Sequence, residues 1–558
     1  MRLEEIRIRN YRSIDDVTLR FPPNKPVILF GPNNAGKSNI WSAILNLRRF
    51  DPRYAVEPQW RPIANGASVY DTLSSNGMLM TQHHLDSLTE KFTNSGAPSR
   101  GCRAATEITL VIDLGDRKEQ IIVGFRNCGY DDYLPYVKNA EILPRLPLPE
   151  DKEILFIQVW ESGSGDPSYY LDYLKIVRGE EGNRSPEWFL KLIPEIDRRV
   201  SDSIKEINVF DELPQGKGVD LPASTFFVGS GQQAWAGRFG DLAAASVIKS
   251  AVSNLQLVII DEPETHLHPN IEEQLWEEIQ TASENGVQVI LTTHSENFLK
   301  ADDLEGFVRV YKENGVTKTC QLTKKKLFLT CNPTLEHYEK ESFVDVFWSV
   351  RLNSDQLKGF FANIILLVEG KTEYYALPVY LSRKFLSQYG IQIVPCDGKT
   401  AILTYWRLFE AYGYKCFILY DYDDQHDDWN KKLEKYFYGE EEKDMYYLLS
   451  ETAAYFRNNW EDYFEFGIDE EKYREIKHDL EGKIKFPPRK EEKEKKEKKE
   501  YFDPKELCAK AIALKMVEEG LGIPFIETLK SNLRKLASMS QEEYVKYVET
   551  VKERLKSE

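Results

Sequence analysis

The N-terminal part of the chain alternates apolar and charged positions in short runs. A period of two is typical of half-buried strands, and a short continuous apolar run is typical of a buried strand. After a glycine-rich loop, apolar residues recur with helical spacing. The pattern predicts strands at Leu3–Arg9, Val17–Phe21, Pro26–Phe30, Glu107–Leu114 and Gln120–Phe125, and a helix at Ile40–Leu47.

Two later regions alternate strand and helix patterns. Residues 225–293 run as loop, helix, buried strand, helix and buried strand. Beyond residue 353, the pattern predicts strands at Ile364–Val368, Ile391–Pro395 and Cys416–Tyr420, separated by helices at Glu373–Tyr389 and Thr400–Ala411. Such alternation predicts a second, smaller parallel sheet. Beyond residue 430, the chain is predicted to be helical.

These patterns predict an α/β protein of several domains. We expect a first domain over residues 1–355, with insertions at 55–105 and about 130–220. A second α/β domain covers 356–450, and a helical C-terminal region covers 451–558. The run RKEEKEKKEKKE at 489–500 is nearly balanced in charge, so we interpret it as a solvated linker rather than a DNA-binding tail.

The composition excludes several classes of protein. A net charge of −17, from 73 Lys+Arg against 90 Asp+Glu, argues against a uniformly basic nucleic-acid coat but allows a local basic groove. No run reaches the roughly 20 apolar residues of a membrane-spanning helix, and the N-terminus lacks the apolar segment of a secretory signal. The 7 scattered cysteines contain no CxxC pair, which indicates reduced thiols and a cytoplasmic protein.

The loop Gly31–Ser38, GPNNAGKS, fits the phosphate-binding pattern GxxxxGK[ST] between a buried strand and a helix. In that context, backbone N–H groups wrap phosphates at a helix N-terminus. Lys37 is predicted to reach the β- and γ-phosphates, and the Ser38 hydroxyl to ligate Mg²⁺. The predicted ATP-binding residues here are Asn33, Asn34, Gly36, Lys37, Ser38 and Asn39.

Two more apolar strands end in residues suited to ATP hydrolysis. Leu255–Ile260 is followed by Asp261 and Glu262, which offer one carboxylate to Mg²⁺ and another to polarise the attacking water. The run from Val289 ends at His294, which is predicted to sense the γ-phosphate. His266 and His268 have metal-ligand spacing, but no third or fourth ligand is placed nearby, so zinc is disfavoured.

Carboxylates also end the strands of the second predicted sheet. Glu369 follows one strand, with Glu373 one helical turn further on, and Asp421 and Asp423 follow another. Carboxyl ends of parallel strands meet at one edge, so these side chains can converge. Crowded carboxylates require a cation, and oxygen ligands favour Mg²⁺ or Mn²⁺.

The N-terminal motifs resemble those of ATP-binding-cassette ATPases, in the branch that contains SMC and RecF. Val228–Gln233, VGSGQQ, is similar to the signature motif, with Ser230 and Gly231 as expected ATP contacts in trans. The resemblance implies a head domain that forms a homodimer or higher homo-oligomer around ATP. It also implies a glutamine loop, for which Gln59 and Gln82 both qualify.

Residues 364–425 resemble the TOPRIM fold, and the order of the two domains resembles the OLD (overcoming lysogenisation defect) nuclease family and the related Gabija nuclease subunit. The resemblance implies two-metal hydrolysis of DNA, with Glu369, Asp421 and Asp423 as principal ligands and Glu373 and Glu461 as further carboxylates. It makes Lys505 the expected catalytic lysine, with Lys510 and Lys399 as alternatives.

The resulting hypothesis is an ATP-regulated, metal-dependent DNA endonuclease in anti-phage defence, with a possible need for a helicase or other defence subunit. An ATP-driven sensor or scaffold with a non-cutting TOPRIM domain is the alternative. A transporter ATPase is disfavoured because it has no use for the acidic second half. Topoisomerases and primases share TOPRIM, but their ATPase type differs.

Overall fold

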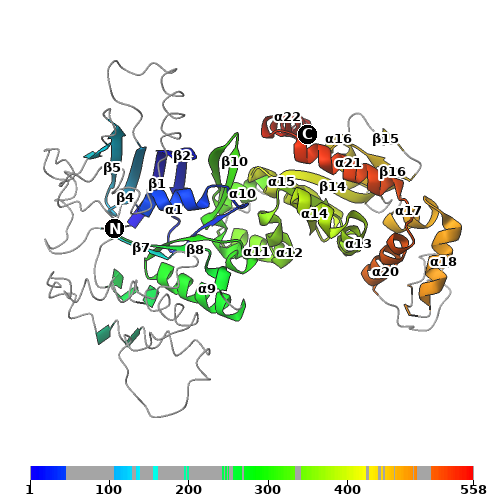
Figure 1. Cartoon of the computed structure of the whole chain (residues 1–558), viewed down its shortest axis with the longest axis horizontal. Coiled ribbons are helices and arrows are strands. Elements are labelled where there is room, and N and C mark those ends of the chain that lie inside the picture. Colours follow the sequence, from blue (N-terminus) through cyan, green and yellow to red (C-terminus); the bar gives the residue numbers. More distant parts are fainter. Residues whose placement is uncertain are drawn as a thin grey trace, which may run out of the picture. The chain divides into compact units, whose positions relative to one another are not determined.

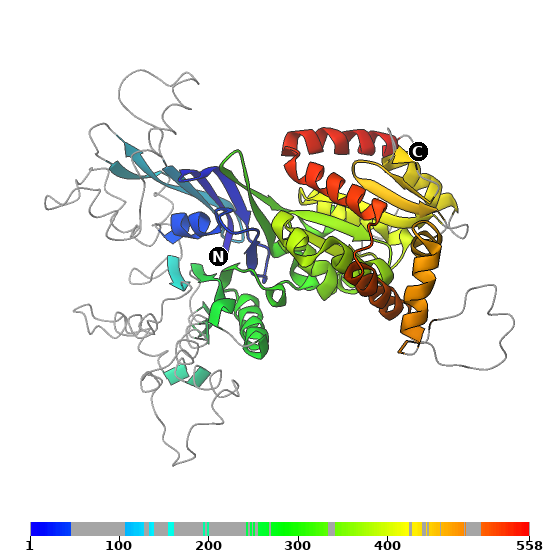
Figure 2. The same cartoon turned by 45° about the vertical axis from the view of Figure 1, so that its right-hand side comes forward.

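The computed structural model describes most of the chain in two compact units, Met1–Leu322 and Thr323–Glu558. The described residues are 2–45, 106–127, 133–138, 155–160, 194–195, 198–199, 242–243, 246–247, 249–250, 255–266, 269–332, 341–422, 427–437, 442–443, 446–457, 459–481, 483–484, 486 and 504–556. Figures 1 and 2 show their elements.

The first unit is built on an 11-stranded sheet with the order β6-β5-β4-β1-β2-β11-β10-β3-β9-β8-β7. Its strands are β1 (Arg2–Tyr11), β2 (Ile14–Arg20), β3 (Val27–Phe30), β4 (Thr106–Asp113), β5 (Lys118–Asn127), β6 (Tyr133–Lys138), β7 (Leu155–Trp160), β8 (Leu255–Asp261), β9 (Gln288–Thr292), β10 (Phe307–Glu313) and β11 (Val316–Gln321). The helices α1 (Lys37–Leu45) and α9 (Pro269–Glu284) follow β3 and β8 along the chain.

The strands β10, β3, β9, β8 and β7 run parallel, and this section positions the first candidate site. All four residues of β3 are buried, as expected for a strand covered on both faces. Thr292 at the end of β9 is paired with Leu29 in β3 and with Asp261 in β8. The carboxyl ends of three strands therefore lie side by side.

Part of the expected insertion at about 130–220 belongs to this sheet. β6 pairs antiparallel with β5, and β7 pairs parallel with β8. β6 follows β5 closely in the chain, whereas the partner of β7 is about 100 residues away, a pairing that local patterns do not reveal. The expected insertion at 55–105 lies outside the described residues.

The second unit contains a six-stranded sheet with the order β13-β12-β14-β17-β16-β15. Its strands are β12 (Ile364–Val368), β13 (Ile391–Pro395), β14 (Lys415–Tyr422), β15 (Glu442–Lys443), β16 (Tyr447–Leu449) and β17 (Ala453–Arg457). The first four strands in this order are parallel and the last two pairings are antiparallel, so the sheet is mixed rather than wholly parallel.

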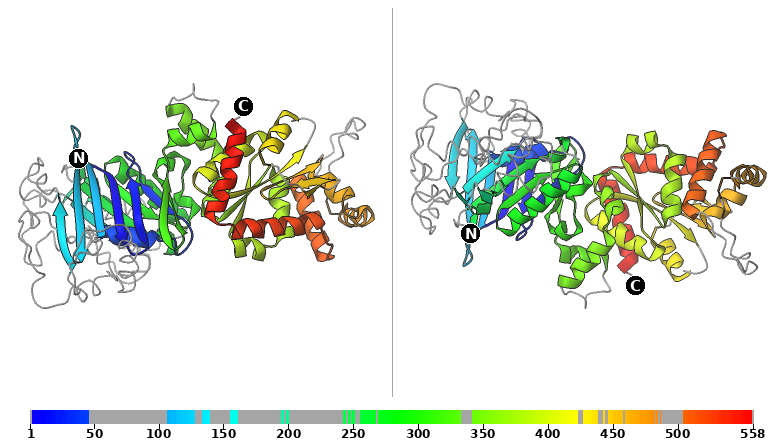
Figure 3. Two further views of the ribbon diagram at one scale, coloured as in Figure 1. Left: turned by 90° about the horizontal axis from the view of Figure 1, so that it is seen from above. Right: turned by 90° about the horizontal axis from the view of Figure 1, so that it is seen from below.

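Helices lie on both faces of this sheet (Figure 3). The helices of this unit are α10 (Lys324–Cys331), α11 (Glu341–Arg351), α12 (Ser354–Leu357), α13 (Lys371–Leu381), α14 (Arg383–Tyr389), α15 (Ile402–Ala411), α16 (Asp427–Phe437), α17 (Trp460–Phe466), α18 (Glu470–Glu481), α20 (Lys505–Glu518), α21 (Pro524–Ser538) and α22 (Gln541–Lys556). Aromatic rings connect β17, α17 and α21, where Phe456 lies 4.6 Å from Phe525 and 5.3 Å from Tyr463 between ring centroids.

Three boundaries differ from those expected. The predicted helix over 373–389 is divided at Ser382, whose φ of 66° cannot continue a helix. The units meet at 322/323 rather than 355/356, since α10 packs against α15 and the Arg407 guanidinium donates to the Cys331 carbonyl at 3.1 Å. β17 pairs with β14, so the second sheet continues past the expected boundary at 450.

Within the described residues, no helix has the length and apolarity needed to cross a membrane.

Candidate functional site

The loop after β3 can adopt its path only with glycine at two positions. Gly31 has φ 145°, and a Cβ there would lie 2.0 Å from the carbonyl oxygen of Val310. Gly36 has φ 109°, and its Cβ would lie 2.1 Å from Oγ1 of Thr317. Neighbouring strands therefore enclose the loop so closely that a side chain at either glycine has no room.

Hydrogen bonds from β1, β2 and β11 hold the other side of the loop. The Asn39 amide nitrogen donates to Oγ of Ser13 at 2.7 Å, and its Oδ1 accepts from the Arg12 guanidinium at 3.2 Å. Thr317 Oγ1 lies 2.7 Å from Ser13 Oγ and donates to the Ala35 carbonyl at 3.1 Å. The β1–β2 turn thus positions the N-terminus of α1.

Lys37 joins this loop to the ends of the neighbouring strands. Its Nζ donates to the Gly31 carbonyl at 3.0 Å and lies 2.8 Å from Nε2 of His294. The same His294 nitrogen lies 3.3 Å from Oε1 of Glu262. Because one nitrogen cannot accept from Lys37 and donate to Glu262 together, the imidazole proton decides which contact is a hydrogen bond.

Burial shifts the pKa of Lys37, His294 and Asp261. Desolvation lowers the pKa of Lys37, while the nearby Glu262 and Asp261 carboxylates oppose that shift. Desolvation also lowers the pKa of His294, with the Lys37 charge acting in the same direction. The pKa of Asp261 is raised by desolvation, against a hydrogen bond from Thr292. Removal from water thus disfavours the charged form of all three groups.

Two residues without a predicted role support these groups. Thr292 Oγ1 donates to Asp261 Oδ1 at 2.5 Å in a buried hydrogen bond. The Glu264 carboxylate accepts a hydrogen bond from the His294 backbone N–H. Both residues stand next to predicted site residues in the sequence, and a polar residue at the end of an apolar strand is the signal that could have identified Thr292.

The second site lies at the carboxyl edge of the six-stranded sheet. β12 and β14 are paired in register, with Val368 opposite Leu419. The Glu369 backbone N–H donates to the Leu419 carbonyl at 3.1 Å, and Glu369 Oε2 accepts from the Asp421 backbone N–H at 3.1 Å. The register therefore places the Glu369 carboxylate, at the end of β12, against the backbone of Asp421 in β14.

Glu373 returns to the same place from the first turn of α13. Its Oε2 accepts from the Gly370 backbone N–H at 3.1 Å, and the residue is only 4% exposed. Burial, with the Glu369 and Glu461 charges, raises the pKa of Glu373 to about 7.

Asp421 is half-buried at the same edge of the sheet. Burial raises its pKa well above the usual range, and the neighbouring Glu373 and Glu369 carboxylates add to that effect. The negative charges of these carboxylates therefore lie close enough to repel one another.

Two candidate lysines differ in exposure. The Lys399 side chain has 0% exposure, and its Nζ lies 3.9 Å from Glu369 Oε2. The Lys505 side chain is 66% exposed, and its Nζ lies 3.4 Å from Glu461 Oε1. Lys399 is thus enclosed beside the acidic cluster, whereas Lys505 has solvent around it at the cluster's outer side.

The donor set suits a hard divalent cation. Glu369, Glu373 and Asp421 offer only oxygen ligands, and Asp421 Oδ1 is buried with no hydrogen-bond partner among the described residues. The described side chains alone do not bring three His, Cys, Asp or Glu groups into an ion-binding arrangement. The expected ligand Asp423 lies outside the described residues.

Family models match both halves of the chain. Residues 360–423 match the family "Overcoming lysogenization defect protein-like, TOPRIM domain". Residues 1–89 match "AAA ATPase domain", and residues 151–300 match an AAA domain family named for the AbiEii toxin of a type IV TA system. The chain joins an ATPase domain to an OLD-like TOPRIM domain. This confirms the resemblance and the α/β fold class expected from the motifs.

Two curated nucleases align with part of this chain. It is 35% identical over 173 residues to the Old nuclease of Escherichia phage P2, an alignment that covers 30% of this chain and 28% of the relative. It is 27% identical over 195 residues to Endonuclease GajA of Bacillus cereus (strain HuB5-5), covering 32% of this chain and 28% of the relative. The matched segments thus span less than a third of either relative.

Solved SMC head domains align at low scores. The SMC head domain from Thermotoga maritima has a TM-score of 0.31 at 16% identity, covering 58% of this chain and 100% of that structure. The Smc head domain from Pyrococcus furiosus, bound to the C-terminal domain of ScpA, has a TM-score of 0.34 at 15% identity, covering 61% and 99%. TM-scores in this range carry no argument about this chain.

Most predicted site residues lie within the described part of the chain. Lys37, Asp261, Glu262 and His294 lie together in the first unit. Glu369, Glu373 and Asp421 lie together in the second, with Glu461 and Lys505 beside them. Asn33, Asn34 and Ser38 are exposed on the loop. The remaining candidates are outside the described residues, namely Ser230, Gly231, Asp423, Gln59, Gln82 and His268.

Proposed function

We propose that this protein is an ATP-regulated, divalent-metal-dependent DNA endonuclease. The observation that supports this most strongly is the cluster of Glu369, Glu373 and Asp421 at the carboxyl edge of the TOPRIM sheet, in which Glu373 is buried and the other two are half-buried. Raised carboxylate pKa values gathered at one site are typical of a functional site rather than a solvated surface. The two nuclease relatives support the same reaction class.

In the first unit, the chain's own residues can bind ATP and orient water. The loop presents backbone N–H groups and the Lys37 ammonium to phosphates, and Ser38 with Asp261 would hold Mg²⁺. A neutral His294 beside Glu262 can hold the proton that a polarised water releases. A buried Asp261 held by Thr292 keeps its carboxylate fixed for the cation.

In the second unit, Glu369, Glu373, Asp421, Asp423 and Glu461 would hold Mg²⁺ or Mn²⁺. Bound cations there would supply Lewis-acid stabilisation to the attacking and leaving oxygens of a phosphodiester. The exposed Lys505 can approach a scissile phosphate from solvent, which the buried Lys399 cannot do. We therefore assign Lys505 the catalytic role and Lys399 a positioning role.

The net charge of −17 fits this assignment. Carboxylates gathered for cations repel DNA until those cations are bound, so we expect DNA binding to be weak without Mg²⁺. We also propose that the ATPase domains form a homodimer or higher homo-oligomer around ATP, that a helicase or other subunit acts with this chain, and that the protein serves anti-phage defence.

Plasmid cleavage with Mg²⁺ or Mn²⁺, with and without ATP, tests the proposed function. We expect wild-type protein to convert supercoiled plasmid to nicked or linear DNA only with a divalent cation. Lys37→Ala should lose ATP turnover and the response of cleavage to ATP, while keeping the metal-dependent site. Absence of cleavage across both metals, ATP states and DNA forms would contradict the nuclease assignment and favour an ATP-driven sensor or scaffold.

A further inference from the structure

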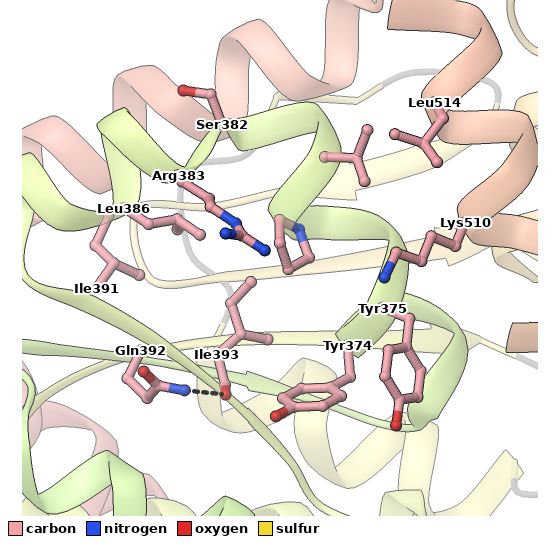
Figure 4. Close-up of a pocket in the computed structure, with 12 residues that line it drawn as sticks. Tyr374, Tyr375, Ser382, Arg383, Leu386, Ile391, Gln392, Ile393, Lys510 and Leu514 are labelled. Carbon is pink, nitrogen blue, oxygen red and sulfur yellow. Dashed lines mark hydrogen bonds between the residues drawn. The ribbon is translucent and has the colours of Figure 1, made fainter. Parts of the chain in front are cut away.

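A pocket of about 510 Å³ lies in the second unit, along the length of α13. Side chains from α13, α14, β13 and α20 line it (Figure 4). Its first lining residues, Tyr374 and Tyr375, directly follow Glu373 in the chain. One end of the pocket therefore lies within one helical turn of Glu373 along α13.

Two cations point into this pocket from different helices. The Arg383 guanidinium from α14 and the Lys510 ammonium from α20 both extend toward its centre in Figure 4. Within the described part of the chain, neither forms an ion pair or a hydrogen bond, and no Asp or Glu lines the pocket. Two cations without a carboxylate favour an anionic ligand.

The remaining wall is aromatic and aliphatic. The Tyr374 and Tyr375 rings are 5.2 Å apart at 71°, and the Tyr374 hydroxyl donates to Asp355 at 3.0 Å, which fixes that ring. Tyr375 is 41% exposed, and Lys510 Nζ lies 5.9 Å from its ring centroid. Ile393 and Leu514 add an apolar surface opposite. Tyr375, which is exposed beside the fixed Tyr374 ring, offers a stacking face to a planar group.

The backbone between α13 and α14 gives the pocket its depth. Pro378 lacks the N–H that would complete the helix, and Ser382, with φ 66°, turns the chain into α14. Both residues line the pocket. The cavity therefore follows from the break at Ser382, at the end of α13 opposite Glu373.

We propose that this pocket receives an unstacked nucleotide of the DNA strand next to the scissile phosphate. The base stacks on Tyr375 between apolar side chains, and Arg383 and Lys510 contact the flanking phosphates. The inference rests on the proposed nuclease function, because it takes the acidic cluster as the cutting site. It adds a preference for single-stranded or unpaired DNA at that site, since a base within a duplex cannot enter a pocket.

Binding of a fluorescent single-stranded oligonucleotide, measured in EDTA by anisotropy at several salt concentrations, tests this. Arg383→Ala combined with Lys510→Ala should reduce the dependence of log K on log salt by about 1.4, since each phosphate contact on a single strand contributes about 0.7. Tyr375→Ala should weaken binding about 5- to 100-fold, the range for one stacked base. Lys384→Ala, which removes an exposed cation of α14 that does not line the pocket, should change neither value.

Circular dichroism on each variant establishes that it is folded, and cross-linking of a 5-iodouracil oligonucleotide to the wild type provides a second measurement. Cross-links in the peptide with Tyr374 and Tyr375 are expected. Cross-links elsewhere, or wild-type affinity in all pocket variants, would overturn the proposal. So would tight binding of a free deoxynucleoside monophosphate without any effect on oligonucleotide binding. Because EDTA prevents cutting, these failures are distinct from failure of the nuclease assignment.

Discussion

Glu369 Oε2 accepts a hydrogen bond from the backbone N–H of Asp421 at 3.1 Å. This bond places the Glu369 side chain against the backbone of the neighbouring strand, so the Glu369 carboxylate is held at the edge of the sheet. Asp421 Oδ1 is buried with no hydrogen-bond partner in the described part of the chain. A buried acceptor of this kind is costly unless a ligand uses it, which supports cation binding here.

Lys399→Met should destabilise the metal-free protein and weaken cation binding. Lys399 is enclosed 3.9 Å from Glu369 Oε2, and its charge opposes the rise in the pKa of Asp421. Removing one partner of a buried ion pair costs about 3–5 kcal/mol, and methionine preserves the volume. Urea unfolding in EDTA measures the loss, and added Mg²⁺ should recover part of it. An unchanged free energy of unfolding would contradict the positioning role.

Lys505→Ala should leave the stability of the protein nearly unchanged but lower the rate of DNA cleavage. Its side chain is 66% exposed, so the free energy of unfolding should change by less than about 0.5 kcal/mol. Loss of a group that stabilises transition-state charge lowers the turnover rate about 100-fold or more. Single-turnover cleavage at saturating Mg²⁺ measures the rate. Lys472→Ala, at another partly exposed ion pair of the second unit, is the matched control. A normal rate in Lys505→Ala would exclude it as the catalytic lysine.

The stability of the metal-free protein should fall as pH rises toward neutrality. Burial raises the pKa of Glu373 from 4.5 to about 7, so the folded protein retains a proton that the unfolded chain has lost. Stability from this proton is present below pH 4.5 and disappears as pH rises through about 7. Each unit of difference in pKa corresponds to about 1.4 kcal/mol.

Glu373→Gln tests this pH dependence because the amide cannot ionise. Urea unfolding in EDTA from pH 4.5 to 8 should show a smaller decline in the variant than in wild type. Glu553→Gln, at an exposed position of α22, should follow the wild-type curve. If wild type and Glu373→Gln declined equally, Glu373 would not be the group that holds the proton.

Thr292→Val should weaken Mg²⁺-dependent ATP hydrolysis without unfolding the protein. Valine keeps the shape of threonine but removes the donor that lies 2.5 Å from Asp261 Oδ1. Leaving a buried acceptor unpaired costs about 1–3 kcal/mol, so we expect a 5- to 100-fold rise in the Mg²⁺ concentration needed for half-maximal turnover. Thr281→Val removes a surface hydrogen bond of α9 to the Glu277 carbonyl and serves as control. Equal Mg²⁺ dependence in both variants would contradict this role.

The strands that carry the sites could be predicted from the sequence. Ile364–Val368 and Ile391–Pro395 have the expected bounds, because continuous apolar runs bounded by polar residues leave little choice of ends. The convergence of Glu369 with Asp421 followed from parallel-sheet geometry alone.

Other features depend on contacts distant in sequence. Nothing local indicates that Thr317 braces the phosphate loop, because that contact links residues far apart in the chain. The break at Ser382 was also not evident, since serine is not a residue that usually takes a positive φ. The different exposure of Lys399 and Lys505 required the packed structure, and the sequence left both as alternatives.

The most direct measurement of the central claim compares plasmid cleavage and ATP turnover in one preparation of Asp421→Asn. Asparagine keeps the size of the side chain and removes the charge that a cation requires. We predict that cleavage with Mg²⁺ or Mn²⁺ falls at least about 100-fold while ATP turnover stays at the wild-type rate. Asp479→Asn, at an exposed position of α18, should retain both activities. Undiminished cleavage by Asp421→Asn would contradict a nuclease site at the edge of the TOPRIM sheet.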